Sequence, residues 1–355
     1  MKTKDFYFDL PEELIAQHPC GERGNDRLMH LDKKTGNTSS LLMKDLPDLI
    51  TPGTVMVFNN SRVRRSRVYG LPLVKDDSKN IPTKKTEFLF IKNLATQTSK
   101  NSVWKAMVKN ARRQRPGKQY CFPDGTIGTI ITDTEDSGSE FRTVEFDRLI
   151  DENWFEKNGH IPLPPYIKRE DVDSDSERYQ TVYAKETGSA AAPTAGLHFT
   201  EEMLERLHKK GIEIVYVTLH VGLGTFLPVR CENIEEHHMH EESFFISDET
   251  AAIIEKAKVE KRPVLAVGTT SLRTLESAWK DGQLRTGHQA TSIFIYPGYD
   301  FKVADCLFTN FHTPESTLLM LVSAFAGKEH IFDAYRKAVK EKYHFFSYGD
   351  AMLID

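Results

Sequence analysis

Two glycine-rich turns that each carry a histidine are the strongest chemical signal in this 355-residue chain. The first, A-A-P-T-A-G-L-H-F-T, contains Gly196 and His198. The second, T-L-H-V-G-L-G-T-F, contains His220, Gly222, Gly224 and Thr225. Glycine lets the backbone approach a ligand closely, and histidine is the side chain that titrates near neutral pH. The pattern therefore indicates a small-molecule site with proton transfer, which favours an enzyme.

Two other segments could complete such a site. T-N-F-H places Asn310 and His312 at the end of an expected strand, where open sheets bind ligands, although His312 could instead be satisfied within a buried turn. V-G-T-T-S-L-R places Thr269, Thr270 and Ser271 at the expected start of a helix, with Arg273 further along it. Such a helix start binds a carboxylate or phosphate, but the same residues could simply cap the helix. Arg273 is a hypothetical charge partner for either anion.

The segment E-E-H-H-M-H-E-E contains three histidines, His237, His238 and His240. An H-x-H pair on a strand can ligate a metal, but the same segment could be an exposed polar corner. We expect no metal, and a metal-dependent hydrolase stays as an alternative. The chain contains neither G-x-G-x-x-G nor G-x-x-x-x-G-K-[ST], so a Rossmann dinucleotide site and a P-loop are unsupported.

Composition is that of an ordinary globular protein, with 39% hydrophobic and 28% charged residues. No apolar run approaches the ~20 residues of a membrane helix, and the N-terminus lacks a signal-peptide core. The four scattered cysteines read as reduced thiols. We therefore expect a cytoplasmic protein that does not bind membranes.

Arginines form two local clusters in this acidic chain of net charge −4. One contains Arg62 and Arg64, and the other contains Arg112 and Arg113. Such clusters bind phosphates, but a charge run can equally be a solvated face. We interpret both as an RNA-binding surface. The nearby aromatic residues Trp104, Tyr120 and Phe122 could stack on bases or belong to a core.

Hydrophobic patterning changes along the chain. A strand is expected at 54–60, and the short alternating runs at 86–92, 102–109 and 125–132 indicate a small β barrel or sandwich. Residues 168–178 have the composition of a solvated acidic connector. After residue 188, alternating elements predict a sheet with flanking helices. The expected helices are 201–210, from 248, 271–280, 316–326 and 329–343, and the expected strands are 212–219, 263–267, 291–296 and 303–309.

Long motifs throughout the chain resemble the S-adenosylmethionine:tRNA ribosyltransferase-isomerase family of queuosine biosynthesis. Besides the motifs above, they include F-N-N-S-R-V (58–63), P-L-P-P-Y-I (162–167), E-R-Y-Q-T-V-Y-A (177–184) and F-F-S-Y-G-D-A-M-L-I (345–354). The resemblance implies an α/β main domain with a mixed sheet and flanking helices, formed by 1–62 and 151–355. An all-β barrel domain at 63–150, which we interpret as a possible tRNA-binding domain, would be inserted in it.

The same resemblance implies transfer of the ribosyl part of S-adenosylmethionine, a co-substrate, to 7-aminomethyl-7-deazaguanine at the wobble position of a tRNA anticodon loop. No cofactor would be permanently bound, and we expect a monomer. This reaction needs groups that accept and donate protons, for which His198, His220 and His312 are the candidates. Gly196, Gly222, Gly224 and Thr225 would contact the nucleoside, Thr269, Thr270, Ser271 and Arg273 the methionine carboxylate, and Asn310 a base edge.

Glu315 and His344 depart from the family pattern, which would place Lys and Arg there. A diverged paralogue that only binds RNA, or that prefers another substrate, is therefore the alternative.

Overall fold

The computed structural model describes residues 1–73, 84–95, 101–133, 140–222 and 229–355. Its contacts divide the chain into two compact units. The first, the sheet unit, comprises Met1–Arg62, Pro164–Glu170 and Ser174–Asp355. The second, the barrel unit, comprises Val63–Leu163 and Asp171–Asp173.

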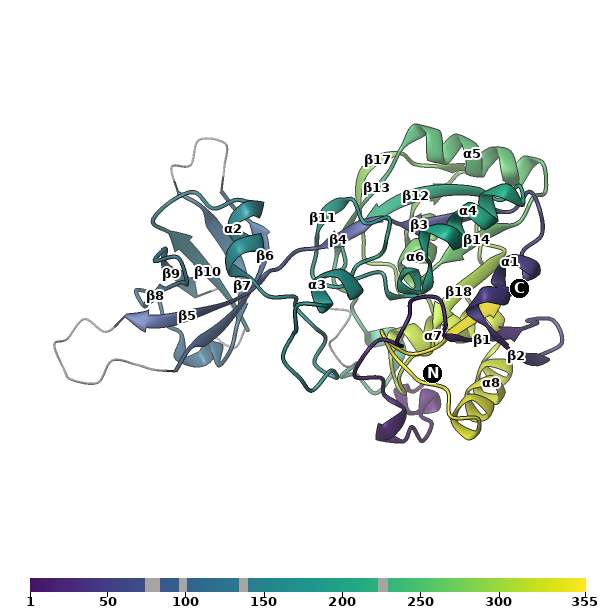
Figure 1. Ribbon diagram of the computed structural model, residues 1–355, viewed down its shortest axis with the longest axis horizontal. Coiled ribbons are helices and arrows are strands. Elements are labelled where there is room, and N and C mark those ends of the chain that lie inside the picture. The colour runs from purple at the N-terminus through teal and green to yellow at the C-terminus, as the bar shows by residue number, and fades with distance from the viewer. Residues whose placement is uncertain (74–83, 96–100, 134–139, 223–228) are drawn as a thin grey trace. The chain divides into compact units, whose positions relative to one another are not determined.

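A nine-stranded mixed sheet forms the centre of the sheet unit (Figure 1). Its strands are β1 (Arg27–Leu31), β2 (Thr38–Leu42), β3 (Val55–Asn59), β12 (Glu213–Leu219), β13 (Glu242–Ile246), β14 (Val264–Val267), β17 (Gly287–Thr291), β18 (Cys306–Asn310) and β19 (Ala351–Ile354), in the order β17-β13-β12-β3-β14-β18-β19-β1-β2. The four strands from β12 to β18 in that order are parallel, as are β19 and β1. Antiparallel pairs complete both edges and join β18 to β19.

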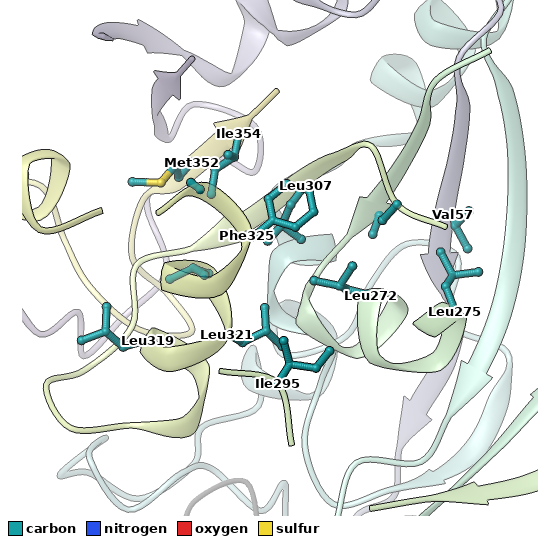
Figure 2. Close-up of a cluster of buried hydrophobic side chains, with 14 of the residues drawn as sticks. Val57, Leu272, Leu275, Ile295, Leu307, Leu319, Leu321, Phe325, Met352 and Ile354 are labelled. Atoms are coloured by element: carbon teal, nitrogen blue, oxygen red, sulfur yellow. The ribbon is translucent and has the colours of Figure 1, made fainter. Parts of the chain in front are cut away.

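Helices cover both faces of this sheet, so its central strands are apolar on both sides. Val55 and Val57 of β3 belong to one core cluster, and the alternating Met56 and Phe58 belong to another. The first cluster includes α5 (Asp248–Val259), α6 (Thr269–Ala278), α7 (Thr317–Ala326) and α8 (Lys328–Lys340), and part of it is drawn in Figure 2. The second includes α1 (Leu46–Leu49) and α4 (Glu201–Lys209).

The barrel unit is a closed barrel of six antiparallel strands. Its strands are β5 (Arg67–Leu73), β6 (Thr86–Asn93), β7 (Val103–Val108), β8 (Gln119–Cys121), β9 (Ile127–Asp133) and β10 (Phe141–Phe146), and α2 (Glu152–Asn158) follows them. Trp104, Tyr120 and Phe122 are buried in its core, so they are core residues and do not form a stacking surface. The predicted fold class, an α/β unit with a mixed sheet and an all-β barrel insert, is confirmed.

Two local predictions were wrong. Residues 292–296 form no strand; β17 ends at Thr291, whose hydroxyl accepts a hydrogen bond from the Ile293 N–H, and Ile295 packs into the core from an irregular segment. The consecutive apolar side chains of this segment pack against the core without strand pairing. Strand β18 also begins later than the predicted 303–309, at Cys306.

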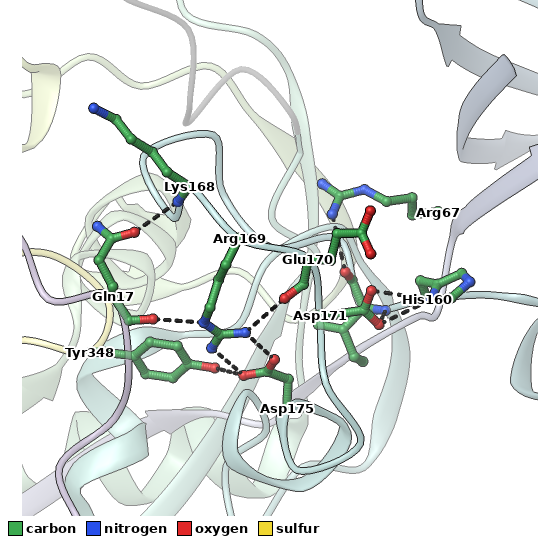
Figure 3. Close-up of polar contacts among 10 residues, drawn as sticks. Gln17, Arg67, His160, Lys168, Arg169, Glu170, Asp171, Asp175 and Tyr348 are labelled. Carbon is green, nitrogen blue, oxygen red and sulfur yellow. Dashed lines mark hydrogen bonds and ion pairs between the residues drawn. The ribbon is translucent and has the colours of Figure 1, made fainter. Parts of the chain in front are cut away.

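The segment 168–178 is also more than a solvated connector. Asp175, at the start of α3 (Asp175–Arg178), is buried and forms a bidentate ion pair with Arg169, with N–O distances of 2.6 and 2.8 Å. The Tyr348 hydroxyl donates to the same carboxylate at 2.8 Å, and Arg169 also donates to the Gln17 carbonyl (Figure 3). Composition could not reveal this, because Gln17 and Tyr348 are distant in sequence and Asp175 becomes buried only in the folded chain.

Candidate functional site

A cavity of about 110 Å³ lies where three parallel strands of the sheet unit end. Val221 follows β12, Gly268–Thr270 follow β14, and Phe311–Thr313 follow β18; all of them line the cavity. Residues 191–195 complete this wall. Gly268 has a φ of +88°, a backbone conformation that favours glycine and lets β14 turn directly into α6. The cavity thus occupies the position at which open α/β sheets bind ligands.

The lining of this cavity is uncharged. Among the described residues that line it there is no Lys, Arg, Asp or Glu. Tyr166 and Phe346 stack with ring centroids 3.9 Å apart and form an aromatic wall. Within the described part of the chain, the buried Tyr179 hydroxyl and Thr270 Oγ1 have no hydrogen-bond partner, and both residues line the cavity. Buried polar groups are normally satisfied, so these two hydroxyls are suited to bind a neutral polar molecule.

His312 lines the cavity and is buried. Burial lowers the pKa of its imidazole from 6.5 to about 3, so the ring is neutral at pH 7. Its Nε2 lies 3.0 Å from the Thr309 hydroxyl, and its backbone N–H donates to the Tyr335 hydroxyl. His312 is therefore a neutral hydrogen-bonding group in the cavity wall.

Asn310 lines the same cavity, whereas His198 lies behind it. The Asn310 Nδ2 lies 3.0 Å from His198 Nε2, and His198 Nδ1 lies 2.7 Å from Asp26. His198 and Asp26 are buried and also line a small separate hollow of about 20 Å³. His198 can thus influence a molecule in the first cavity through Asn310.

His220 lines a second, larger cavity of about 790 Å³, so the three predicted histidines do not share one cavity. This cavity lies beside β12 and β13, and its lining includes Tyr183, Tyr216 and Phe245. A Cβ added to Gly188 would lie 2.8 Å from the His220 ring, so glycine is required beneath this histidine.

Only some of the residues that were predicted to contact the methionine carboxylate line the first cavity. Thr269 and Thr270 line the first cavity, but the Ser271 hydroxyl donates to the Val267 carbonyl at 2.8 Å. Arg273 forms a buried ion pair with Glu242 of β13, at an N–O distance of 2.5 Å. Its charge is therefore already compensated inside the protein, and Arg273 is not part of the cavity lining.

The predicted glycines also have different surroundings. A Cβ on Gly196 would lie 2.0 Å from the Tyr183 hydroxyl, so close packing within the protein explains this glycine. The Gly222 N–H donates to Glu242, the partner of Arg273, at 2.9 Å. Gly224 and Thr225 lie outside the described residues.

Residues 3–354 match the family model described as queuosine biosynthesis protein. The chain belongs to this family. It is 58% identical to the S-adenosylmethionine:tRNA ribosyltransferase-isomerase of Treponema denticola and 48% identical to that of Clostridioides difficile, with complete coverage of both chains in each case. It is also similar to the crystal structure of S-adenosylmethionine tRNA ribosyltransferase from Thermotoga maritima, at 33% identity and a TM-score of 0.55, covering 99% of this chain and 100% of that one.

Some residues that line the cavity were not predicted as site residues, although they lie in motifs that resemble the queuosine family. Tyr166, Tyr179, Phe346 and Ser347 line the cavity, and each belongs to a motif that carried the resemblance. Asp26 carried no signal of its own, because an isolated acidic residue is unremarkable in sequence. Only the fold brings it to His198.

The two arginine clusters differ in their surroundings. Arg64 forms an ion pair with Glu152 within the barrel unit, with a shortest N–O distance of 2.5 Å, and lies over the Trp104 ring. Arg62 is half-buried on β4 (Ser61–Val63). Arg112 and Arg113, in the short helix Ala111–Arg113, are exposed. The second cluster is therefore the better candidate for phosphate contacts.

Glu315 and His344, which depart from the queuosine-family pattern, are not themselves part of the cavity lining. Glu315 adopts a φ of +57° between Thr313 and Ser316, and its N–H donates to the Phe6 carbonyl. His344 is exposed, and its backbone N–H donates to Asp350. Neither residue lines the first cavity.

No three His, Cys, Asp or Glu side chains come together as a metal-binding group among the described residues, which include His237–His240. His237 instead packs edge-on against Phe294. In the same described part of the chain, no helix is long and apolar enough to cross a membrane.

Proposed function

We propose that this chain transfers the ribosyl moiety of S-adenosylmethionine to 7-aminomethyl-7-deazaguanine in tRNA and isomerises it, giving epoxyqueuosine-tRNA, adenine and methionine. The observation that carries this proposal is the match to the queuosine family over residues 3–354, with 58% identity to the Treponema denticola enzyme along its whole length. The alternative of a diverged RNA-binding paralogue has no support in these comparisons. The wobble position of the anticodon loop, a cytoplasmic location and action as a monomer are further parts of the proposal.

The first cavity is the proposed site for the base of S-adenosylmethionine. Its volume of about 110 Å³ suits only part of that molecule, and its uncharged lining suits the neutral adenine. The charged sulfonium and amino-acid groups would then lie outside it. Thr270 Oγ1 and the Tyr179 hydroxyl, which have no partners in the described chain, would bond to the nucleoside.

The second cavity is the proposed site for the acceptor base. Its volume of about 790 Å³ is in the range of ligand pockets, and Tyr216 and Phe245 offer aromatic surface for stacking. The carboxylates of Glu186 and Glu249, which also line it, would attract the aminomethyl cation. Because an RNA loop base is unpaired, it can turn into such a pocket at low cost.

The reaction needs proton transfer beside both cavities. The sulfonium makes the adjacent C5′ hydrogen acidic, the attacking amine must become neutral, and protonation of a ring nitrogen helps adenine to leave. His220 lines the acceptor cavity and is the proposed proton acceptor. The neutral, buried His312 supports a hydrogen-bonding role on the adenine side.

The direct test is to incubate the protein with S-adenosylmethionine and tRNA that carries the 7-aminomethyl-7-deazaguanine base. We expect adenine and an altered nucleoside, both measurable by chromatography and mass spectrometry, with the same rate in the presence of a metal chelator. The same tRNA with guanine at that position is the control and should release no adenine. Failure of the modified tRNA to release adenine would refute the proposed function.

A further inference from the structure

A chain of four buried or half-buried polar side chains runs from the first cavity into the protein. Thr194 Oγ1 donates to Asn310 Oδ1 at 3.0 Å, Asn310 Nδ2 lies 3.0 Å from His198 Nε2, and His198 Nδ1 lies 2.7 Å from Asp26 Oδ2. The exposed fractions of Asp26, His198 and Asn310 are 8%, 3% and 2%. Water can therefore do little to loosen these contacts.

The inner end of this chain fixes the tautomer of His198. Burial works to raise the pKa of the Asp26 carboxyl, but hydrogen bonds from His198 and Cys20 help to bring it below its usual value. An ionised carboxylate can only accept hydrogen bonds, so His198 Nδ1 carries a proton and donates to Asp26. The group that faces Nε2, at 3.0 Å, is the amide nitrogen of Asn310, which can only donate, so Nε2 is the acceptor of this contact.

This arrangement fixes the amide of Asn310. An amide can donate two hydrogen bonds and accept two. His198 takes one donor and Thr194 takes one acceptor position, so one N–H and one oxygen lone pair remain. Asn310 lines the cavity, so the remaining pair is available to a molecule bound there.

We propose that Asp26 and His198 are positioning residues that hold the Asn310 amide in the orientation that recognises adenine. This inference rests on the proposed function for its ligand. Adenine offers an amino donor next to a ring-nitrogen acceptor, and the asparagine amide is the side chain that pairs with both. The bond from Asn310 to the ring nitrogen would also stabilise the negative charge that develops on adenine as it leaves.

Thr194 secures the outer end of the same amide. Without its hydroxyl, Asn310 Oδ1 would lose a fixed donor. Without the Asp26 carboxylate, His198 could carry its proton on Nε2, and the amide would have to rotate to avoid two facing donors. Either change would present the wrong group to adenine, so both variants should weaken recognition in the same way.

The test compares binding of free adenine and free hypoxanthine, which has a carbonyl oxygen in place of the amino group. Calorimetry should show that the unaltered protein prefers adenine by about tenfold or more, the range of a bidentate asparagine contact. Asp26→Asn and Thr194→Val should each reduce this preference to about twofold. In the adenine-release assay, both should raise KM for S-adenosylmethionine and lower kcat.

Asp355→Asn is the matched control, because Asp355 pairs with His30 in the same unit but does not line the cavity. It should keep the preference for adenine. If the unaltered protein shows no preference, or if both folded variants retain it, the inference is overturned. Because base binding needs no turnover, a protein that prefers adenine but never releases it would refute the proposed reaction and leave the positioning role standing.

Discussion

His220 and Val221 are consecutive residues, yet their side chains line two different cavities. Val221 contributes to the uncharged cavity at the strand ends, and His220 contributes to the larger one beside β12 and β13. The chain therefore contributes to both cavities within two consecutive residues. Two cavities that are lined by consecutive residues suit a group transfer between two substrates.

His220→Ala should lower kcat by about a hundredfold or more, the usual contribution of a proton-transfer group, with little change in tRNA binding. Gly188→Ala tests the same histidine independently, because the added Cβ would displace the His220 ring. It should reduce turnover in the same direction. Normal adenine release by His220→Ala would exclude this residue from the chemistry.

Thr270→Val should raise KM for S-adenosylmethionine about fivefold to tenfold, the value of one hydrogen bond, because it removes an otherwise unpartnered cavity hydroxyl. Thr274→Val in the same helix is the control. Its hydroxyl donates to the Thr270 carbonyl and does not line the cavity. Steady-state kinetics that give equal KM values for the two variants would argue against the assignment of this cavity.

Replacing Arg112 and Arg113 together by alanine should weaken tRNA binding and reduce the slope of log K against log salt by about 1.5, since each phosphate contact contributes roughly 0.7–0.9. Filter binding at several salt concentrations measures this. Arg64→Ala is the comparison, because Arg64 is already paired with Glu152. An unchanged slope in the double variant would place the RNA elsewhere.

Arg273→Met should reduce the free energy of unfolding by about 3–5 kcal/mol, because it leaves the buried Glu242 carboxylate without its ion-pair partner. Denaturant titration measures the loss. Adding Glu242→Gln should recover part of it, because the remaining charge is then removed. A wild-type unfolding curve for the single variant would show that the pair carries little stability.

Stability should depend on pH through His312. Its pKa is about 3 when folded and about 6.5 when exposed, so between these values the unfolded chain binds more protons. This contribution is complete above pH 6.5 and is lost as the pH falls toward 3. His312→Gln should therefore flatten the rise of stability with pH in this window, whereas His30→Gln should not, because hydrogen bonding to Asp355 raises the pKa of His30.

Sequence patterns were sufficient to predict the helices and strands in which buried residues recur at a regular helical or strand spacing. Helix 201–210 and strand 212–219 were predicted within a residue of α4 and β12, because Gly211, with a φ of +81°, separates them. Residues 292–296 were misassigned because the apolar run I-F-I-Y packs against the core without pairing to a strand. A hydrophobic pattern indicates which side chains are buried, but it does not show whether the segment pairs with a neighbouring strand.

Within the site, local motifs identified the residues that follow parallel strands, such as Thr270, Asn310 and His312. They could not divide His198, His220 and His312 among three surroundings. That division depends on Asp26 and on the two sides of β12, which only the folded chain brings together. Arg273 was misread for the same reason, since its partner Glu242 belongs to another strand.

Strand β19 lies between β18 and β1 in the interior of the sheet. During synthesis on the ribosome, β1 must therefore wait for residues 351–354, and until they emerge it has only β2 as a neighbour. The barrel strands, which are contiguous in sequence, can pair much earlier. Folding of the sheet unit is thus a late event, and a premature stop codon shortly before residue 351 should produce a chain with a finished barrel and an open, aggregation-prone sheet.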